Sequence, residues 1–455
     1  MYGRNSQENL HIRALAQPVD LPGLHRLAPQ RYPFLLQSTA PGPTLGRFDI
    51  LFAFPGAAIE LGADGRTRGR HDEGGFLATL DAWWKCESCR PDPSALPFTG
   101  GWFLFLGYEL AQEIEPSLDL QPDPVLPAAF AVRCPAAIVY DHADRQAYWV
   151  VEADARIDHA KFISDLEEVT NSVQHMTAPA SAVNATEETP ADFLHAIGQA
   201  KNYIAAGDIY QTNLSRSWTA CVDDEVLPEQ IYSSLCTANP APFAGIARWN
   251  GTTVISSSPE RLLEIRGGSA STRPIAGTRP RSDNTDVDDS LSRELFANAK
   301  ERAEHVMLID LERNDLGRIC EPGTVEVDES MVLESYAHVH HIVSNVRGRL
   351  RADVTPGDAI AAVFPGGTIT GCPKVRCMQI IDELETAPRG AYTGSFGYLN
   401  RDGSLDLNIL IRTMVMHDGT ITLRAGCGIV ADSEPDAELA ETRAKAAGML
   451  RALRK

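Results

Sequence analysis

Short apolar segments separated by turns dominate this sequence and restrict its fold more than any other feature. The first 176 residues contain four such segments, at 47–54, 101–106, 128–140 and 147–151, and one helical pattern at 73–86. Further strands are predicted at 210–218, 244–248, 254–257, 338–346, 394–399, 405–416 and 420–425, and further helices at 290–313, 373–385 and 435–453. Because the helices are interleaved irregularly with strands joined by short turns, we expect a mixed α+β fold.

The segment Thr189–Gly207 carries a complete helix signal. Thr189 can cap the helix, Pro190 suits its first turn and Gly207 suits its end. Apolar residues spaced by three or four form a stripe at Phe193, Ile197, Ala200 and Ile204. The small, polar residues before this helix predict a linker. We therefore divide the chain into an N-terminal region (1–176), a linker (177–191) and a C-terminal region (192–455).

Composition and charge exclude several functional classes. The 455 residues have a formal net charge of −20, which argues against nucleic acid as a partner. An anionic substrate must then be bound by locally placed cations, backbone amides or a metal. No apolar run is long enough to span a membrane, and no apolar signal segment follows the N-terminus. Nine scattered cysteines are typical of a reduced, cytoplasmic protein.

Two pairs of glutamates have the spacing of a possible metal site. Glu301 and Glu304 would lie on one face of a helix, and Glu438 and Glu441 repeat this spacing on the last helix. If the two helices faced one another, the four carboxylates could bind Mg²⁺ and leave coordination positions for a substrate. Glutamates three residues apart are also common on solvated helix faces.

Two glycine-rich segments could bind an anion through backbone amides. Residues 364–374 run into a predicted helix, with Thr370 as a possible cap and Pro373 in the first turn. They are not a Walker A loop, because Cys372 stands where lysine is required. Gly426 and Gly428 lack the third glycine of a dinucleotide fingerprint, but they could expose backbone to a carboxylate. A purely structural turn is the alternative for residues 364–374.

Histidines and one arginine lie within predicted strands. His338, His340 and His341 could form a metal cluster, but we favour a single buried, hydrogen-bonded His341. Arg412 lies among apolar residues of the predicted strand 405–416, so its guanidinium needs a partner. That partner is either a protein carboxylate or a substrate carboxylate.

The order of these motifs resembles that of the chorismate-utilising enzymes. The resemblance is most specific from about Asp192 onward, and it is looser in the N-terminal region, at Arg31–Ser38, Arg47–Ile50 and Gly100–Phe103. It rests on the glycine-rich loop and on Gly207–Ser215, Ser258–Arg261, Arg273–Arg281, Glu304-His305, Asp310–Arg318, Ile411–Thr413 and Gly426–Ser433. It implies the chorismate-binding fold, with antiparallel sheets packed together and flanking helices, and an N-terminal region like that of anthranilate synthase component I.

The resemblance also implies roles for individual residues. Mg²⁺ would be bound chiefly by Glu304 and Glu441, with Glu301 and Glu438 as close support. The substrate carboxylates and neighbouring atoms would contact Gly277, Thr278, Tyr392, Arg412, Gly426, Gly428 and Lys445. The catalytic positions would be Glu260, Ala276, His341, Thr368 and Gln211. His341 and Thr368 would lie beside the C4 hydroxyl, and His341 could assist its departure.

Three residue positions bear on which reaction this family member catalyses. Gln211 stands where the water-adding branches carry a lysine base, which favours ammonia as the nucleophile. Ala276 excludes the covalent lysine used by many aminodeoxychorismate synthases and is shared with anthranilate synthases. Thr368 belongs to a loop, 365–371, that resembles the aminodeoxychorismate branch. We favour that branch, which is a transferase of transaminase type for p-aminobenzoate and folate synthesis, over anthranilate formation and over a non-catalytic binding protein of the same fold.

Partners and ligands also follow from the resemblance. The sequence contains no nucleophile elbow of a glutaminase, so a separate glutamine amidotransferase subunit is expected to supply ammonia. Four residues resemble the region where this family binds tryptophan: Ser38, Arg47, Asn239 and Pro240. Gln37 replaces the glutamate typical of feedback-regulated anthranilate synthases, which argues against feedback regulation by tryptophan.

Overall fold

Two large antiparallel sheets form the framework of the protein. The computed structural model describes residues 10–40, 46–70, 74–172, 184–223, 225–281, 284–335 and 339–454. The first sheet has the strand order β1 (Leu10–Ala14), β9 (Gln146–Glu152), β8 (Ala136–Asp141), β3 (Phe48–Ala53), β2 (Phe34–Gln37), β12 (Phe243–Trp249), β13 (Thr252–Ser258), β22 (Thr413–His417), β23 (Thr420–Ile429), β11 (Gln211–Cys221) and β10 (Ala185–Glu187), and β19 (Gly371–Cys372) also pairs with β11.

The second sheet is built in the same antiparallel manner. Its strand order is β16 (Ile275–Pro280), β18 (Val339–Arg349), β15 (Ser269–Arg273), β14 (Arg261–Arg266), β21 (Leu405–Asn408), β20 (Ser395–Asn400), β6 (Gly101–Leu106), β7 (Ala129–Cys134), β4 (Ala58–Leu61) and β5 (Thr67–Arg68), with β17 (Glu326–Ser335) beside β18. The helices are α1 (Leu21–Leu27), α2 (Phe76–Glu87), α3 (Ala111–Ile114), α4 (His159–Asn171), α5 (Pro190–Ala206), α6 (Pro228–Ala238), α7 (Thr285–Ala297), α8 (Ala299–Gly317), α9 (Pro356–Val363), α10 (Lys374–Leu384) and α11 (Pro435–Ala452).

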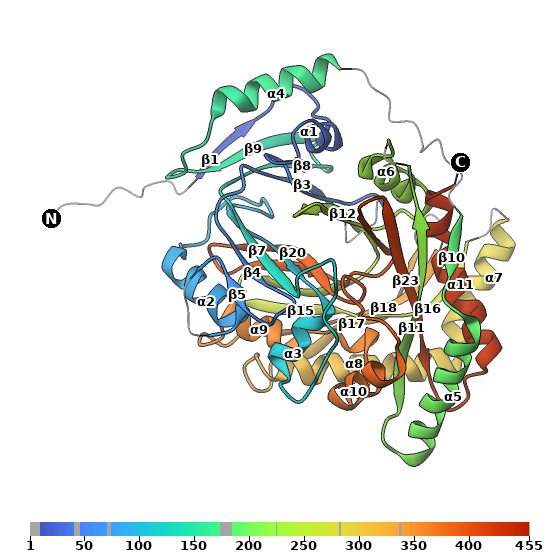
Figure 1. Cartoon of the computed structure of the whole chain (residues 1–455). Coiled ribbons are helices and arrows are strands. Elements are labelled where there is room, and N and C mark those ends of the chain that lie inside the picture. The colour runs from blue at the N-terminus through green and yellow to red at the C-terminus, as the bar shows by residue number, and fades with distance from the viewer. Residues whose placement is uncertain are drawn as a thin grey trace.

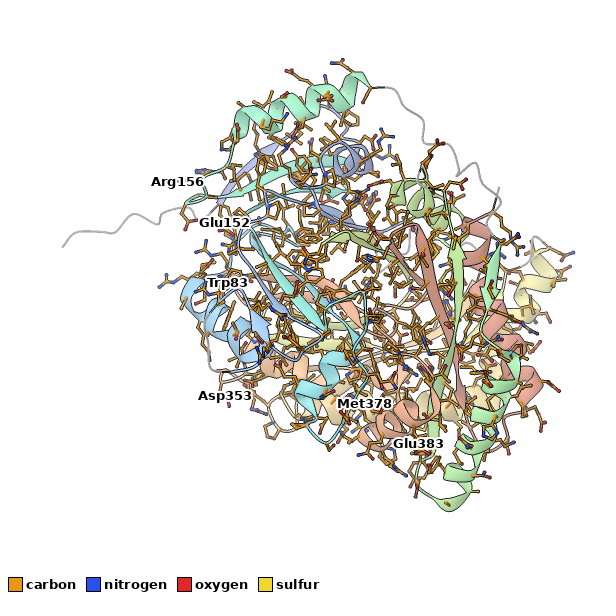
Figure 2. The ribbon with its side chains drawn as sticks, in the orientation of Figure 1. Trp83, Glu152, Arg156, Asp353, Met378 and Glu383 are labelled. Atoms are coloured by element: carbon orange, nitrogen blue, oxygen red, sulfur yellow. The ribbon has the colours of Figure 1, made fainter. Side chains whose placement is uncertain are left out.

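The two sheets pack face to face, with helices on their outer sides (Figure 1). Phe34 of the first sheet stacks on Phe103 of the second, with ring centroids 3.9 Å apart, and Phe52 packs edge-on against the same ring. Figure 2 shows that side chains fill the interior between the sheets. Helices α1, α4, α6 and α11 cover the first sheet, and α2, α8 and α9 cover the second. The predicted α+β class, with packed antiparallel sheets and flanking helices, is confirmed.

Strands from the N-terminal and C-terminal regions are mixed in both sheets. Strand β2 pairs with β12 in the first sheet, and β6 pairs with β20 in the second. The regions 1–176 and 192–455 therefore share one framework. Of the predicted linker, residues 177–183 lie outside the described residues, whereas Ala185–Glu187 form β10 and α5 begins at Pro190. The predicted linker is thus partly regular structure.

Several predicted elements match the structure, but three that were predicted as single elements are each divided in two. Helix α5 begins at Pro190 and ends at Ala206, and Gly207 caps it with a φ of 82°, the left-handed value of a helix stop. The single strand predicted at 128–140 is wrong, because it divides into β7 and β8. The single helix predicted at 290–313 is wrong, because the chain bends at Asn298 between α7 and α8. The single strand predicted at 405–416 is also wrong, because it divides into β21 and β22. Among the described residues, no helix is long and apolar enough to cross a membrane.

Candidate active site

Glu260 is a buried carboxyl group in the short connection between β13 and β14. The backbone there is fixed by β21 and the residues after it: Ser258 Oγ donates a hydrogen bond to the Ile409 carbonyl, and the Ile409 amide donates to the Glu260 carbonyl. The hydroxyl of Thr368 donates to Glu260 Oε1 at 2.9 Å. Burial raises the pKa of Glu260 to about 7, although the hydrogen bond from Thr368 opposes this shift. At neutral pH, Glu260 can therefore donate or accept a proton.

Arg412 lies in the break between β21 and β22. Its backbone adopts the left-handed conformation, with φ of 53°, so the expectation that Arg412 lies within a continuous strand is wrong. Its guanidinium forms no hydrogen bond or salt bridge with any of the residues that the structure describes. Burial lowers the pKa of Arg412, and the charge of Glu260 opposes this shift. Arg412 is thus a desolvated cation available to bind a carboxylate.

The strands β16 and β18 place three predicted residues beside this pair. Ala276 pairs with Ile342, and the register then shifts at Gly277, whose φ is 66°. His341 is buried, and it forms a hydrogen bond with the backbone of Gly277. Burial and, secondly, the charge of Arg412 lower the pKa of His341 to about 4. The imidazole is therefore neutral near pH 7 and is a poor proton donor there.

The other residues predicted on or beside β16 and β18 are Thr278, His338 and His340. The side chain of Thr278 lies outside the described residues, as does His338. His340 is also buried, and its Nε2 lies 3.0 Å from Asp288 Oδ1. We expected only His341 to be buried, so this second buried histidine was missed. Within the described part of the chain, these histidines form no group of three potential metal ligands.

A second wall of the site is formed by β11, β23 and the turn before β20. Ser215 pairs with Gly426, and Asn213 pairs with Gly428. A Cβ atom at Gly426 would lie only 2.7 Å from the Tyr392 hydroxyl and 2.8 Å from Asn213 Oδ1, so both polar atoms face bare backbone. The structure therefore requires glycine at position 426.

Two further predicted residues complete this wall. A Cβ atom at Gly428 would collide with the side-chain amide of Gln211, which covers that glycine. Lys445 Nζ donates to the Gly426 carbonyl at 3.0 Å, and its charge also lowers the pKa of Glu260. Lys445 thus links this wall to the part of the site that contains Glu260 and Arg412.

Asn213 is a site residue that we did not predict. Its Oδ1 atom is buried without a hydrogen-bond partner in the described structure, and it points toward Tyr392 and Gly426. The period of two along a strand could have identified it, because residues 211 and 213 share one face of β11. The same strand pairing places Gly428 opposite Asn213.

The glycine-rich segment has an architecture different from the predicted one. It forms a short 3₁₀ turn at Gly367–Ile369, and the Thr370 hydroxyl donates to the Gly366 carbonyl instead of capping α10. Pro373 is the cap residue of α10, so placing it in the first helical turn was wrong by one position. Lys374 Nζ then contacts Asp315 Oδ2 at 2.6 Å, which ties the start of α10 to α8. In this conformation of the loop, Thr368 lies within hydrogen-bonding distance of Glu260.

The four glutamates of the proposed metal site lie on helices, as predicted. Glu301 and Glu304 are on α8, and Glu438 and Glu441 are on α11. They do not form a group of three potential metal ligands in the described residues, and Glu441 pairs with Lys445 at 2.8 Å. Glu301 Oε1 pairs with Arg279, but its Oε2 atom is buried without a hydrogen-bond partner and faces the bare backbone of Gly277. The oxygen donors suit Mg²⁺, and this buried oxygen is one available ligand.

Two of the four residues expected near tryptophan line a separate cavity. Ser38 and Arg47 border a space of about 380 Å³ between the sheets, together with Arg261 and Tyr398. Asn239 and Pro240 are not among the residues that line it, and the Asn239 side-chain amide donates to the Ser257 carbonyl.

Comparison with known proteins agrees with this fold. The family model described as chorismate binding enzyme matches residues 34–451. An anthranilate synthase component I-like protein from Synechocystis sp. is 46% identical over 79% of this chain and 74% of its own length. The aminodeoxychorismate synthase component 1 of Bacillus subtilis is 39% identical over 94% of this chain and 93% of its own. The structure of anthranilate synthase component I from Streptococcus pneumoniae superposes with a TM-score of 0.80 at 32% identity, covering 89% of this chain and 92% of that one. The chain belongs to the chorismate-binding enzyme family.

Proposed function

We propose that this protein is an aminodeoxychorismate synthase component I, which converts chorismate and ammonia to 4-amino-4-deoxychorismate and water. The observation that carries the proposal is the available guanidinium of Arg412 beside the protonatable Glu260. This pair matches a substrate that has a carboxylate and loses a hydroxyl group. The full-length similarity to the Bacillus subtilis aminodeoxychorismate synthase supports the same branch.

In this proposal, the two walls of the site bind the two carboxylates of chorismate. Arg412 binds one carboxylate through its guanidinium. The second carboxylate contacts Tyr392 and Lys445, which lie beside the bare backbone at Gly426. These local charges overcome the repulsion of a chain whose net charge is −20.

Glu260 serves as the acid for the departure of the C4 hydroxyl group. Ammonia adds at C2 while the C4–O bond breaks, and the proton of Glu260 moves to the departing oxygen to give water. His341 is neutral and therefore positions this oxygen without supplying the proton. A second ammonia then adds at C4 while the first leaves from C2, and the new ammonium group returns one proton to Glu260. Ala276 provides no covalent nucleophile for any of these steps.

Mg²⁺ remains part of the proposal. Glu301, Glu304, Glu438 and Glu441 would bind it, and the ion would neutralise and polarise a substrate carboxylate. The support is the placement of both pairs on helices and the buried Oε2 atom of Glu301.

A partner subunit of the glutamine amidotransferase class is proposed as the source of ammonia. The component I designation of the relatives supports a partner component. We further propose a cytoplasmic location and a role in p-aminobenzoate and folate supply. The cavity bordered by Ser38 and Arg47 is the proposed place for tryptophan.

Anthranilate synthase component I is the second candidate. Ala276 and the 46% identity to the anthranilate synthase component I-like protein favour it. Both reactions share the intermediate aminated at C2, and anthranilate forms if that intermediate loses pyruvate. The fate of this intermediate therefore distinguishes the two functions.

Product analysis separates these functions. The purified chain is incubated with chorismate, Mg²⁺ and ammonium, and the products are resolved by chromatography. We expect 4-amino-4-deoxychorismate without pyruvate. Fluorescent anthranilate with an equal amount of pyruvate would reject the first function in favour of the second. If chorismate is neither bound nor converted, the protein is a non-catalytic member of the family.

A further inference from the structure

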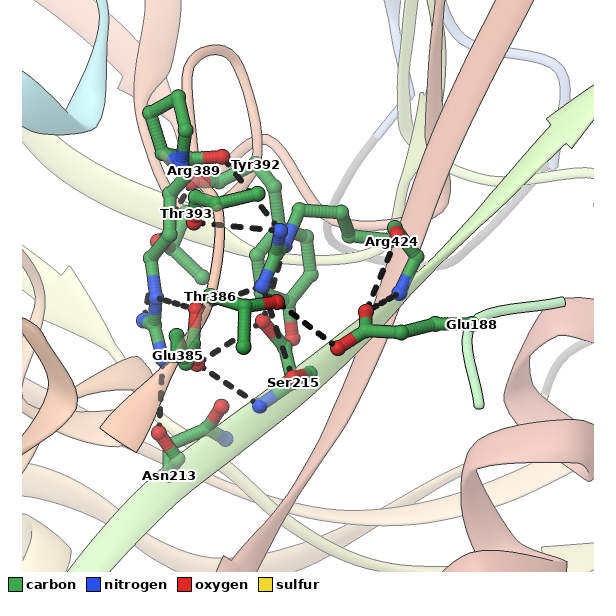
Figure 3. A network of polar contacts seen from close by, with 12 residues as sticks. Glu188, Asn213, Ser215, Glu385, Thr386, Arg389, Tyr392, Thr393 and Arg424 are labelled. Atoms are coloured by element: carbon green, nitrogen blue, oxygen red, sulfur yellow. Dashed lines mark hydrogen bonds and ion pairs between the residues drawn. The ribbon is translucent and has the colours of Figure 1, made fainter. Parts of the chain in front are cut away.

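A buried ion triad lies directly behind the wall formed by Asn213, Tyr392 and Gly426. It consists of Glu385, at the end of α10, with Arg389 and Arg424 (Figure 3). Arg424 precedes Gly426 by two residues on β23, and Arg389 precedes Tyr392 by three. The three charged side chains are at most 8% exposed. Such a desolvated group of charges is costly unless every member is satisfied.

The carboxylate of Glu385 is fully engaged. Its two oxygens accept five hydrogen bonds: from Arg389 Nη2 at 2.6 Å, Arg389 Nε at 3.1 Å, Arg424 Nη2 at 2.7 Å, and the Ser215 amide and hydroxyl at 2.8 and 3.0 Å. Burial alone would raise the pKa of Glu385, yet the two guanidinium groups hold it below its ordinary value. Glu385 is therefore ionised throughout the physiological range.

Arg389 connects the triad to three segments of the active site. Its guanidinium donates to the Asn213 carbonyl at 2.7 Å, to the Ile369 carbonyl at 3.2 Å and to the Thr393 hydroxyl at 3.3 Å. These residues belong to β11, the glycine-rich loop and the turn that carries Tyr392. Together with the bonds to Glu385, all five N–H groups of Arg389 are used, so its orientation is fixed.

Arg424 adds the fourth segment, β23. Its Nε donates to the Ser215 hydroxyl at 3.1 Å, and Nη2 donates to Glu385. The network therefore joins the four segments that present Thr368, Asn213, Tyr392 and Gly426 to the site. Two guanidinium groups and one carboxylate also leave one net positive charge behind this wall.

We propose that Glu385, Arg389 and Arg424 are positioning residues, which hold Asn213, Tyr392 and Gly426 at the spacing that receives a carboxylate of chorismate. This inference rests on the proposed function and extends it. The residues act through the wall, because the triad is buried beneath it. The geometry of Arg424 matters more than its charge. Arg424→Lys keeps the positive charge but loses the planar guanidinium that donates to both Ser215 and Glu385.

Steady-state kinetics of Arg424→Lys tests this inference. A misplaced binding wall raises the KM for chorismate on the order of 10-fold to 100-fold, with a smaller change in kcat. The matched control is Arg376→Lys, a half-buried arginine on α10 that pairs with Asp208, and it should leave KM unchanged. Ser215→Ala, which removes one hydroxyl from the network, should raise KM several-fold. This milder variant decides the question if Arg424→Lys does not fold.

A double-mutant cycle with Tyr392→Phe separates positioning from general destabilisation. If Arg424 acts through Tyr392, the KM increase of the double variant is smaller than the product of the two single increases. The inference is overturned if the KM increase of the double variant equals the product of the two single increases. It is also overturned if KM is unchanged in folded Arg424→Lys and Ser215→Ala. The proposed function stands in both cases. If the unaltered chain does not bind chorismate, the proposed function and this inference both fall.

Discussion

Replacing Glu260 with glutamine should stabilise the protein at alkaline pH. The folded-state pKa of Glu260 is raised from 4.5 to about 7 by burial. A raised pKa means that the folded state binds the proton more tightly than the unfolded state does. The resulting stability is fully present below pH 4.5, and it is lost as the pH rises through 7. Glutamine has no ionised form and keeps an oxygen for the Thr368 hydroxyl, so this loss is absent in the variant.

The magnitude follows from the pKa shift and the size of the chain. Each pKa unit corresponds to about 1.4 kcal/mol, so the shift from 4.5 to about 7 corresponds to about 3 kcal/mol at pH 8.5. With an unfolding entropy of roughly 2 cal/mol/K per residue, a chain of 455 residues has a total of roughly 1 kcal/mol/K. Glu260→Gln should therefore raise Tm by about 3 °C at pH 8.5 and by almost nothing at pH 4.5.

Differential scanning calorimetry across pH 4.5–8.5 measures this difference. The exposed Glu167→Gln variant on α4 is the control and should show no comparable pH dependence. A Tm difference that is constant with pH, or a Glu260→Gln variant that is less stable at pH 8.5, would refute the argument from burial. The same carboxyl group is the proposed acid, so kcat of the unaltered enzyme should fall as the pH rises through about 7.

Three further substitutions test other parts of the site. Arg412→Lys should raise the KM for chorismate on the order of 10-fold to 100-fold in initial-rate assays, because lysine keeps the charge but loses the planar guanidinium that bonds a carboxylate through two N–H groups; an unchanged KM would show that Arg412 does not bind substrate. Gly426→Ala should abolish chorismate binding in calorimetric titrations, because its methyl group would lie 2.7 Å from the Tyr392 hydroxyl. Gly198→Ala, in open space on α5, serves as its control and should increase stability by about 0.5–1 kcal/mol. Glu441→Gln should weaken Mg²⁺ binding at least about tenfold by titration calorimetry while the folded structure is kept, and equal affinity in both proteins would contradict the metal assignment.

Local signals in the sequence predicted the elements that depend on few tertiary contacts. Helix α5 was predicted from Pro190 to Gly207 because a first-turn proline, an apolar stripe and a glycine stop all lie within it. The strand β6 was predicted at 101–106 because its residues are continuously apolar, as expected for a strand buried on both faces. The family motifs likewise identified Glu260, Thr368 and Lys445 as parts of one site.

The tertiary structure decided what these residues can do. No sequence signal indicated the break at Arg412, because a left-handed arginine is held there by its surroundings and not by its own preference. Glu301 pairs with Arg279, which belongs to another element of the structure. The pKa of Glu260 is raised because other segments enclose its carboxyl group. The sequence by itself determined the family, the strand and helix types and the candidate residues. Only packing determined their protonation, their partners and the available cation, because desolvation and charge depend on neighbours from other parts of the chain, such as Arg412 near Glu260.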